Sequence, residues 1–357
     1  MKAAIIIANY NKRELLKKCL ISLKNQTFQD FEVFVVDNGS RDSSVSYVKK
    51  KFPKVNLKAL SKNTGFAKAN NIGIKKALEK DQFKNQLKYI LPLNNDIELD
   101  PRYLEEMIKA AESYKAKNVK LGVLAAKLYF WENPRLLNTT GTVIQRDGSG
   151  MERGFKNLDK GQFDKKSDTF GSCAAAALYT KKMLLDTKFK DPKGFDNFFD
   201  NDFFAYYEDL DLNYRSRLKG YEAFFVPKAI GYHLHSATGV SFSPFKSFHV
   251  HRNQYYVLIK NFPLPFLLLG FAIMPFRYLF LLISAIIGRG PSAQLKKSAK
   301  TAGLFKIVIF SWFEIIKNFR LLLKKRRLIQ KDRKVSLRIF NSWFKNYKAS
   351  WKKMIFD

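Results

Sequence analysis

The first hundred or so residues repeat a short apolar run, a polar turn and a helical stretch, and this repetition restricts the chain to few folds. The apolar runs are too short for helices and are rich in Ile, Val and Leu, as buried strands are. We predict strands at 3–8, 31–36, 55–60 and 89–93 and helices at 11–25, 42–52 and 66–79. Such alternation predicts an α/β fold with a doubly wound, mostly parallel sheet, whose ligand site lies at the carboxyl ends of the strands.

Two local signals indicate where helices begin. Asn11 and Glu14, three residues apart, predict a capping box at the first helix. Pro101, which follows the fourth strand, predicts the first turn of another helix. Beyond it we expect short strands at 122–128, 140–145 and 172–179, and a further strand at 223–226.

Residues 206–220 predict a helix with opposite charges at its two ends. Its acidic side chains lie in the first turn and its basic ones in the last, as the helix dipole favours: Glu208, Asp209 and Asp211, then Arg215, Arg217 and Lys219. Gly220 predicts the C-terminal stop. Apolar residues at four-residue spacing predict one buried face, which leaves Glu208 and Asp209 exposed at the N-terminal rim, where a general base could be mounted. An ordinary acidic first turn is the alternative.

Lys and Arg number 64 and Asp and Glu 31, a formal net charge of +33. This excess predicts a polyanionic partner, which could be nucleic acid, an anionic membrane surface or a phosphorylated substrate. No nucleic-acid-binding module is recognisable, so we expect no nucleic acid, although a basic nucleic-acid-binding tail is the alternative. Cys19 and Cys173 give no disulfide framework, which suits a reducing compartment.

The C-terminal part has the pattern of a membrane-associated region. Residues 264–288 are apolar except for Arg277, and Pro275 interrupts them, so we expect an interfacial or re-entrant helical pair broken at Pro275. A true span and a core helix are the alternatives. Residues 303–323 predict a helix with a wide apolar side and a basic polar side, as in helices that lie in the membrane plane. A basic surface of this kind strengthens attachment to anionic lipid.

Five ordered motifs together resemble those of the family 2 inverting glycosyltransferases, and most closely the subgroup that adds rhamnose or related sugars to lipid-linked bacterial polysaccharides. The motifs are Ala8-Asn9-Tyr10-Asn11, Val36-Asp37-Asn38-Gly39-Ser40, Asn63-Thr64-Gly65-Phe66-Ala67-Lys68-Ala69-Asn70-Asn71, Leu93-Asn94-Asn95-Asp96 and Tyr207-Glu208-Asp209-Leu210-Asp211. The resemblance implies a GT-A domain at 1–260, with 261–357 as a basic, amphipathic helical region for membrane association.

The resemblance also implies which residues bind the donor, a nucleoside-diphosphate sugar, with UDP and dTDP both open. The implied donor-binding residues are Ala8, Asn9, Tyr10, Asp37, Asn63, Gly65, Asn94 and Asn95. A divalent cation, Mg or Mn, would be held by Asp96 and His233. Asn94 stands where the family often has the first carboxylate of an Asp-x-Asp motif, although an amide can still accept a hydrogen bond from the sugar or from water.

Inverting sugar transfer is a single in-line displacement, which needs a base for the acceptor hydroxyl and charge stabilisation for the departing nucleoside diphosphate. We expect Asp209 to be the base and Glu208 its helper or an acceptor contact. Asp211 would brace the helix or bind acceptor hydroxyls. His235, two residues after His233, and Arg252 are further acceptor candidates. We expect His249 and His251 to be structural histidines, with contact to acceptor phosphates, together with Arg252, as the alternative.

The sequence therefore predicts a metal-assisted inverting glycosyltransferase at the cytoplasmic face of the cell membrane, peripheral or re-entrant. It would move a hexose or deoxyhexose to a lipid-linked or cell-surface glycan. A catalytically silent nucleotide-sugar-binding scaffold of a membrane glycan-assembly complex is the alternative. The intact Glu208-Asp209 pair argues against a catalytically silent protein, and Asn94 argues for one.

Overall fold

The structure is a computed structural model that describes residues 1–190, 194–234 and 243–350, with backbone alone at 291–292 and 295–305. The chain forms two compact units. The first contains Met1–Thr142, Glu152–Ala205 and the segment that begins at Tyr221. The second contains Val143–Met151, Tyr206–Gly220 and the C-terminal helices.

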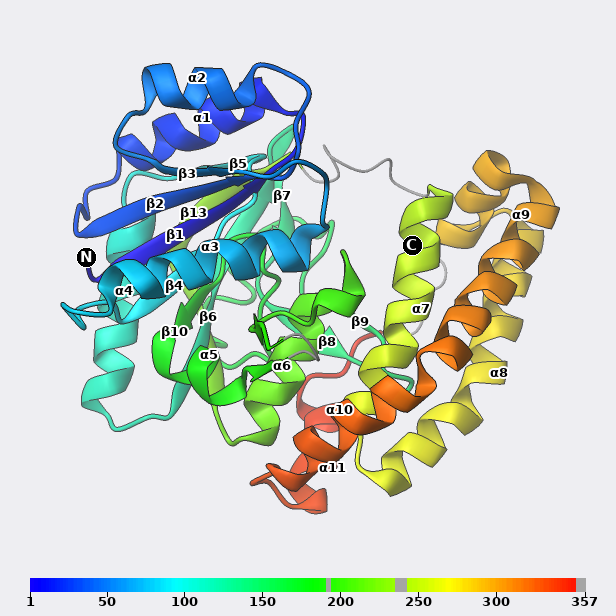
Figure 1. The fold of residues 1–357 in the computed structure, drawn as a ribbon. Helices are drawn as coiled ribbons and strands as arrows, with labels where there is room; N and C mark the ends of the chain where they lie inside the picture. Colours follow the sequence, from blue (N-terminus) through cyan, green and yellow to red (C-terminus); the bar gives the residue numbers. More distant parts are fainter. Residues whose placement is uncertain (191–193, 235–242, 351–357) are drawn as a thin grey trace. The chain divides into compact units, whose positions relative to one another are not determined.

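The first unit is built on a sheet that, within the described residues, has nine strands in the order β3-β2-β1-β4-β10-β6-β13-β5, with β7 beside β6 (Figure 1). The strands are β1 (Ala3–Asn9), β2 (Phe31–Asp37), β3 (Asn56–Ala59), β4 (Tyr89–Pro92), β5 (Ile97–Leu99), β6 (Leu121–Phe130), β7 (Asn133–Thr139), β10 (Leu178–Thr180) and β13 (Glu222–His233). Strands β1 to β4 pair in parallel, as do β6 and β13. The expected sheet is confirmed, with β5, β7 and β10 antiparallel to their neighbours.

Helices cover both faces of this sheet, since Figure 1 shows α1 and α2 on one side of β1 and β2 and α3 on the other. The helices are α1 (Arg13–Lys24), α2 (Ser44–Lys51), α3 (Phe66–Asp81), α4 (Tyr103–Ala116) and α5 (Lys181–Thr187). Alternation along β1 explains the two layers. Ile5 belongs to the core that also contains residues of α1 and α4, whereas Ile6 lies under α3, where Gly73 allows close approach.

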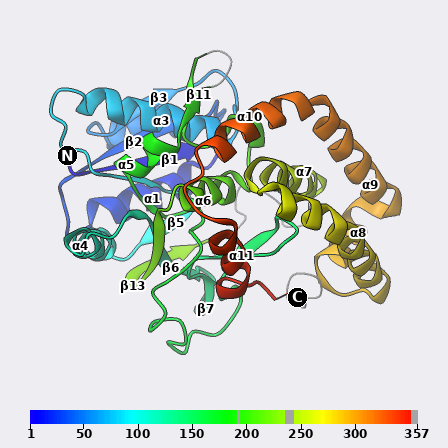
Figure 2. The same cartoon turned by 90° about the horizontal axis from the view of Figure 1, so that it is seen from below.

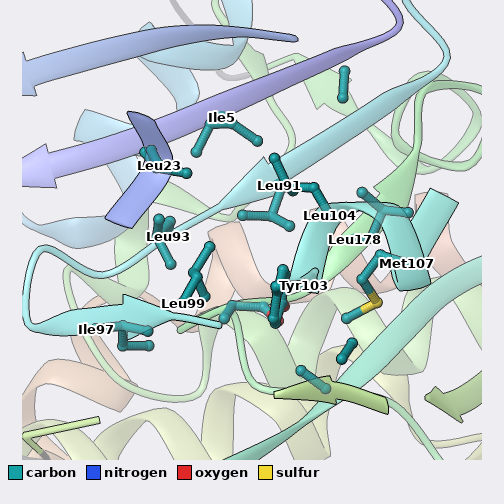
Figure 3. Packing of buried hydrophobic residues seen from close by; sticks show 14 of the residues in the cluster. Ile5, Leu23, Leu91, Leu93, Ile97, Leu99, Tyr103, Leu104, Met107 and Leu178 are labelled. Carbon is teal, nitrogen blue, oxygen red and sulfur yellow. The ribbon is translucent and has the colours of Figure 1, made fainter. Parts of the chain in front are cut away.

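The core between the sheet and helices α1 and α4 is aliphatic. Figure 3 shows Leu23 of α1 and Leu104 and Met107 of α4 among residues of the neighbouring strands. Leu91, Leu104 and Met107 are fully buried. Each such side chain stabilises the fold by roughly 1.5–3 kcal/mol. This layer holds rigid the strands whose carboxyl ends carry the polar motifs.

Short elements complete the two units. They are β8 (Thr142–Ile144), β9 (Gly150–Glu152), β11 (Phe189–Lys190), β12 (Asp196–Asn197) and a 3-10 turn at Asn201–Phe203. Strands β8 and β9 pair, as do β11 and β12. The expected strand at 172–179 is shorter than predicted, because only Leu178–Thr180 pairs regularly and Ala176 makes an isolated bridge to Leu93.

The second unit is helical, with α6 (Glu208–Leu218), α7 (Pro244–Asn261), α8 (Leu264–Ile287), α9 (Gly290–Lys317), α10 (Phe319–Lys331) and α11 (Leu337–Asn346). Figure 2 shows α9 leading from α8 to α10 and α11. Aromatic rings join the helices: Phe262, which follows α7, contacts Phe340 and Phe344 of α11 at centroid distances of 5.3 and 5.7 Å. Residues 143–151 also belong here, because Ile144 bridges to Lys348.

Several helix predictions were wrong in detail. Asn11 does not cap α1: its φ is 49° and its Oδ1 accepts from the Arg41 backbone N–H, while Lys12 is the N-cap. Pro101 precedes α4 by two residues. The helical pair expected at 264–288 is one unbroken helix, α8, with Pro275 inside it. The helix expected at 303–323 is split at Asn318 between α9 and α10.

Candidate active site

The carboxyl ends of β1 and β2 bring Asn9 and Asp37 together, since the parallel register sets these residues opposite each other. Asn9 Nδ2 donates to Asp37 Oδ2 at 3.0 Å, and Asn95 Nδ2 donates to Asn9 Oδ1 at 2.7 Å. Asp37 also accepts from the Ser40 hydroxyl at 2.7 Å and from the Ser40 backbone N–H at 2.9 Å. The network holds a buried carboxylate in a fixed position.

A second polar group lies at the N-terminus of α3. Asn38 Nδ2 donates to Asn63 Oδ1 at 2.9 Å, and Asn38 Oδ1 accepts from the Thr64 backbone N–H at 2.8 Å. Gly65, the N-cap of α3, has a φ of 86°, and a Cβ there would lie 2.6 Å from the Phe204 carbonyl oxygen. Glycine is therefore required on steric grounds. The first turn of α3 has no acidic residue, which leaves its dipole free to favour an anion.

Asp96 and His233 form a close pair, because β13 pairs antiparallel with β5 and sets His233 opposite Ile97. The Leu234 backbone N–H donates to the Asp96 carbonyl at 3.0 Å. His233 Nε2 lies 3.3 Å from Asp96 Oδ1, and His233 Nδ1 lies 3.0 Å from Asn138 Oδ1. With Nδ1 facing Asn138, Nε2 and the Asp96 carboxylate lie next to each other, as two ligands of one cation would.

The donor set of this pair fits Mg or Mn as a partial ligand set, with a carboxylate oxygen and an imidazole nitrogen. Among the described residues, no three His, Cys, Asp or Glu side chains surround one point, so a bound metal would take its other ligands from donor phosphates, water or amides. Asn94 Oδ1 is buried without a hydrogen-bond partner and is one such acceptor. Asp96 also lines a cavity of about 120 Å³ with Lys18, Trp131 and Leu234.

The other predicted donor residues lie at the same strand ends. Ala8 is the penultimate residue of β1, and Tyr10 follows the strand with 40% of its side chain exposed. Asn95 is buried, as described above through its bond to Asn9. His235 lies outside the described residues.

In the second unit, α6 carries the predicted base. Tyr206 and Tyr207, immediately before it, both have a φ of 69°, a region that costs about 1 kcal/mol or more for residues with a side chain. Asp209 is half-buried, whereas Glu208 is 5% exposed, so the expectation that both carboxylates lie at an exposed rim is wrong for Glu208. The cause is that α6 is buried nearly all round, from Leu210 to Leu218.

The two carboxyl groups at the start of α6 are electrostatically distinct. Burial, and next the charge of Asp209, raise the pKa of Glu208 well above its usual value of 4.5. Glu208 Oε2 has no hydrogen-bond partner in the described structure. The raised pKa of Glu208 favours its protonated form, whereas Asp209 is half-buried, so the surroundings of the two carboxyl groups differ, as they do in paired catalytic carboxyls.

Asp211 braces α6, the first of the two roles that the sequence left open. It is fully buried, and its carboxylate accepts from Lys260 Nζ at 2.8 Å, Asn261 Nδ2 at 2.8 Å and Arg215 Nε at 2.9 Å. These contacts leave it no exposure to acceptor hydroxyls. Sequence analysis missed Lys260 and Asn261, whose only signal was a charged and an amide residue at the end of an otherwise apolar helix face.

The histidines and Arg252 of α7 are held by neighbouring side chains. His249 Nδ1 lies 2.9 Å from the Phe245 carbonyl oxygen, and His251 Nε2 lies 2.6 Å from the Tyr278 hydroxyl. These contacts agree with a structural role. Arg252 is 8% exposed, and its guanidinium stacks on the rings of Phe248 and Tyr256.

Comparisons with known proteins agree with this geometry. A family model described as glycosyl transferase family 2 matches residues 4–186, just over half of the chain. The poly(ribitol-phosphate) beta-glucosyltransferase of Bacillus spizizenii is 40% identical over 70 residues, which are 18% of this chain and 11% of that protein. Glycosyltransferase GlyA of Streptococcus pneumoniae is 28% identical over 118 residues, 32% of this chain and 16% of that protein. The match thus spans less than a fifth of either relative.

Among solved structures, GalNAc-T7 with UDP, GalNAc and Mn2+ superposes with a TM-score of 0.53 at 13% identity, over 73% of this chain and 48% of that chain. At this identity the likeness shows the fold, which is the GT-A fold expected from the motifs.

Proposed function

The chain belongs to glycosyl transferase family 2, and we propose that it is an inverting enzyme that moves a hexose or deoxyhexose from a nucleoside diphosphate to a lipid-linked glycan. The donor would be a UDP- or dTDP-sugar, and rhamnose is one candidate sugar. The relative from B. spizizenii is named for glucosyl transfer to poly(ribitol-phosphate), which supports a cell-envelope glycan as the acceptor. We place the reaction at the cytoplasmic face of the membrane.

One observation carries the proposal: polar side chains at the ends of five strands form two buried, hydrogen-bonded groups in one unit. Asn9, Asp37 and Asn95 form the first, and Asp96, His233 and Asn138 the second. Each group holds a buried carboxylate, Asp37 or Asp96, in a fixed position among polar side chains. We assign the first group to the nucleoside and the second to the metal and diphosphate.

Asp96 and His233 would hold Mg or Mn, with Asn138 orienting the imidazole. When bound, the cation supplies positive charge to the departing diphosphate. Asp209 would accept the proton of the attacking acceptor hydroxyl, and the raised pKa of Glu208 would disfavour a second negative charge beside it. Inversion follows from a single displacement, which needs one base and no protein nucleophile.

Asn94 keeps one alternative open, a silent nucleotide-sugar-binding scaffold, because a carboxylate is replaced by an amide two residues before Asp96. A donor-only protein would bind nucleotide sugar normally and release no nucleoside diphosphate when acceptor is supplied. Hydrolytic release of UDP or dTDP by the purified protein, abolished in Asp209→Asn, argues for the enzyme.

The experiment that tests the donor site measures thermal stabilisation of the purified full chain by UDP-, dTDP- and GDP-sugars with Mn²⁺ or Mg²⁺. We predict that Asp96→Asn and Asn138→Ala each weaken metal-dependent donor binding by about 10–100-fold, the usual effect of losing a ligand or the group that orients it. Asn133→Ala, an exposed change on the same strand as Asn138, is the matched control. Donor binding that is indifferent to EDTA and to both variants would remove the metal from the proposal.

A further inference from the structure

We propose that a groove between α7 and α9 binds the phosphate and the adjoining hydrocarbon of a lipid-linked acceptor. The inference deepens the proposed function and rests on it, since it assigns the lipid end of the acceptor to residues of this chain. The groove has a volume of about 740 Å³, which lies within the range of small-molecule sites in proteins.

The walls of the groove suit a hydrocarbon chain. Phe248 of α7 faces Ile307, Phe310 and Phe313 of α9 across it. Phe310 and Phe313 are 59% and 61% exposed, which is costly in water and favourable against lipid. The exposed apolar surface continues along α9 at Ile309 and Ile316 and along α8. A lipid chain could therefore pass between a bilayer and the groove without entering water.

The charges in the groove suit an anion. Arg252 lines it, with its guanidinium fixed between Phe248 and Tyr256 at 5.4 and 5.1 Å from the ring centroids. Lys306 lines it from α9 with an exposed ammonium group. Glu314 is the acidic member of the lining, and its carboxylate accepts from Lys317 at 3.4 Å and Asn318 at 3.2 Å. A fixed guanidinium and an ammonium that line the same groove favour phosphate.

The number of cations indicates which phosphate fits. A phosphate monoester carries about −1.5 to −2 charges at pH 7, and a diphosphate ester carries at least as many, whereas the phosphodiester of a bilayer phospholipid carries one. Because Lys317 pairs with Glu314, Arg252 and Lys306 supply two net positive charges, which balance the mono- or diphosphate better. We therefore assign the groove to a lipid with a terminal mono- or diphosphate, the chemistry of a membrane-bound sugar acceptor, and not to bulk phospholipid.

The test measures binding of hexadecyl phosphate to the full chain in micelles of an uncharged detergent, by calorimetry, with hexadecanol as the uncharged control. We expect the phosphate to bind at least about tenfold more tightly, because two charge-assisted contacts are lost in the alcohol. Dioleoyl phosphatidylglycerol should compete at least about tenfold more weakly than hexadecyl phosphate. Equal binding of alcohol and phosphate, or equal competition by the phospholipid, would overturn the assignment.

Variants locate the site. Lys306→Gln should weaken hexadecyl phosphate about five- to tenfold, and Phe310→Ser should weaken both the phosphate and the alcohol. Arg252→Gln should have the larger effect on phosphate, but Arg252 is buried, so the exposed Lys306 carries the test. The matched control is Lys324→Gln, which removes the same charge from an exposed residue of α10 that does not line the groove. An equal loss in Lys306→Gln and Lys324→Gln would mean general surface attraction and refute the groove.

Nucleotide-sugar stabilisation, measured on the same samples, separates this inference from the proposed function. If nucleotide sugars stabilise the protein as expected but hexadecyl phosphate and hexadecanol bind equally, only the assignment of the groove is refuted. If hexadecyl phosphate binds more tightly than hexadecanol but no nucleotide sugar stabilises the protein, the proposed function is refuted. The assignment of the bound lipid as an acceptor is then refuted with it.

Discussion

Asp209 and Glu208 are adjacent in the chain, yet Glu208 is buried with a raised pKa and Asp209 is half-buried, and this difference predicts different phenotypes. Asp209→Asn keeps size and most hydrogen bonds, so donor affinity should hold within a few fold while turnover falls by roughly 10² or more, the usual contribution of a positioned base. Calorimetry measures the first and nucleotide release the second. An Asp209→Asn protein with near-normal turnover would transfer the role to Glu208.

Glu208 should also make stability depend on pH. Its pKa is raised above the usual 4.5 by burial and then by the charge of Asp209, so the folded protein holds a proton that the unfolded chain releases. That contribution is complete below pH 4.5 and is lost as pH rises through the raised pKa. Relative to wild type, Glu208→Gln should therefore unfold at increasingly higher temperature as pH rises from about 5 toward the raised pKa.

Thermal unfolding across this pH range measures the effect, with Glu79→Gln, an exposed carboxyl on α3, as the control. If the difference in unfolding temperature between Glu208→Gln and wild type does not change with pH, Glu208 is not held protonated in the folded protein.

At the scale of elements, α10 fixes the end of α7, whose last carbonyl groups lack partners within the helix. Arg326 Nη1 donates to the Ile259 and Phe262 carbonyls at 2.7 and 2.5 Å, and Gln330 Nε2 donates to the Asn261 carbonyl at 2.9 Å. Because the Lys260 and Asn261 side chains bind Asp211, α10 supports through α7 the helix that carries Asp209.

We predict that Arg326→Ala lowers the free energy of unfolding by about 2–3 kcal/mol, since it removes two hydrogen bonds from a charged donor. Hydrogen exchange should accelerate at the C-terminal turn of α7, and turnover should fall. Arg327→Ala, the exposed neighbour on the same helix, should leave both unchanged. Equal effects of the two variants would show that α10 contributes only general stability.

The same elements show how far the sequence predicts the structure. The strand-turn-helix repeat predicted the order of β1 to β4 along the chain and their parallel pairing, because local periodicity and short turns determine both. It could not give the Asp96–His233 distance, which depends on β13 pairing with β5 far away in the chain. Asn138 was missed for this reason. The burial of Glu208 was missed because α6 is enclosed by residues from α7 and α11.

The split of the C-terminal helix at Asn318 was missed for a different reason. The Asn318 side chain donates to the Tyr256 hydroxyl at 3.0 Å and to the Glu314 carbonyl at 2.9 Å, and these contacts end α9. No local signal in the sequence competes with the continuous apolar and basic pattern around it. The division of function at residue 260 stays a prediction.

At the scale of the whole molecule, charge and exposed apolar surface indicate how the protein would meet a membrane. The net charge is +33. One described helix, α8, is long and apolar enough to cross a bilayer, and 17% of its most apolar window is buried. Its central Arg277 donates to Asp147 at 3.0 Å, and Asp147 lies outside the helix in residues 143–151. This ion pair favours a helix that lies in the membrane plane, because a span would draw residues 143–151 into lipid.

We therefore predict that the protein binds vesicles through the exposed side of α8 and is released only in part by high salt. Truncation is a poor test, because Phe262, Phe340 and Phe344 are buried in the second unit. The substitutions Phe276→Gln, Leu279→Gln and Ile286→Gln change side chains that are 63%, 53% and 71% exposed. Their apolar transfer free energies, roughly 1.5 kcal/mol each, should weaken partitioning at least about 100-fold.

Sedimentation with anionic and neutral vesicles at low and high salt measures this. The matched control is Phe83→Gln, Leu158→Gln and Phe195→Gln, which changes three exposed apolar residues of the first unit. The α8 variant carries the same charges as the wild-type protein. Its remaining, salt-sensitive binding to anionic vesicles should therefore equal the electrostatic part of wild-type binding. If the α8 variant stays bound in high salt as wild type does, α8 does not enter the bilayer and attachment is electrostatic or lies elsewhere in the chain.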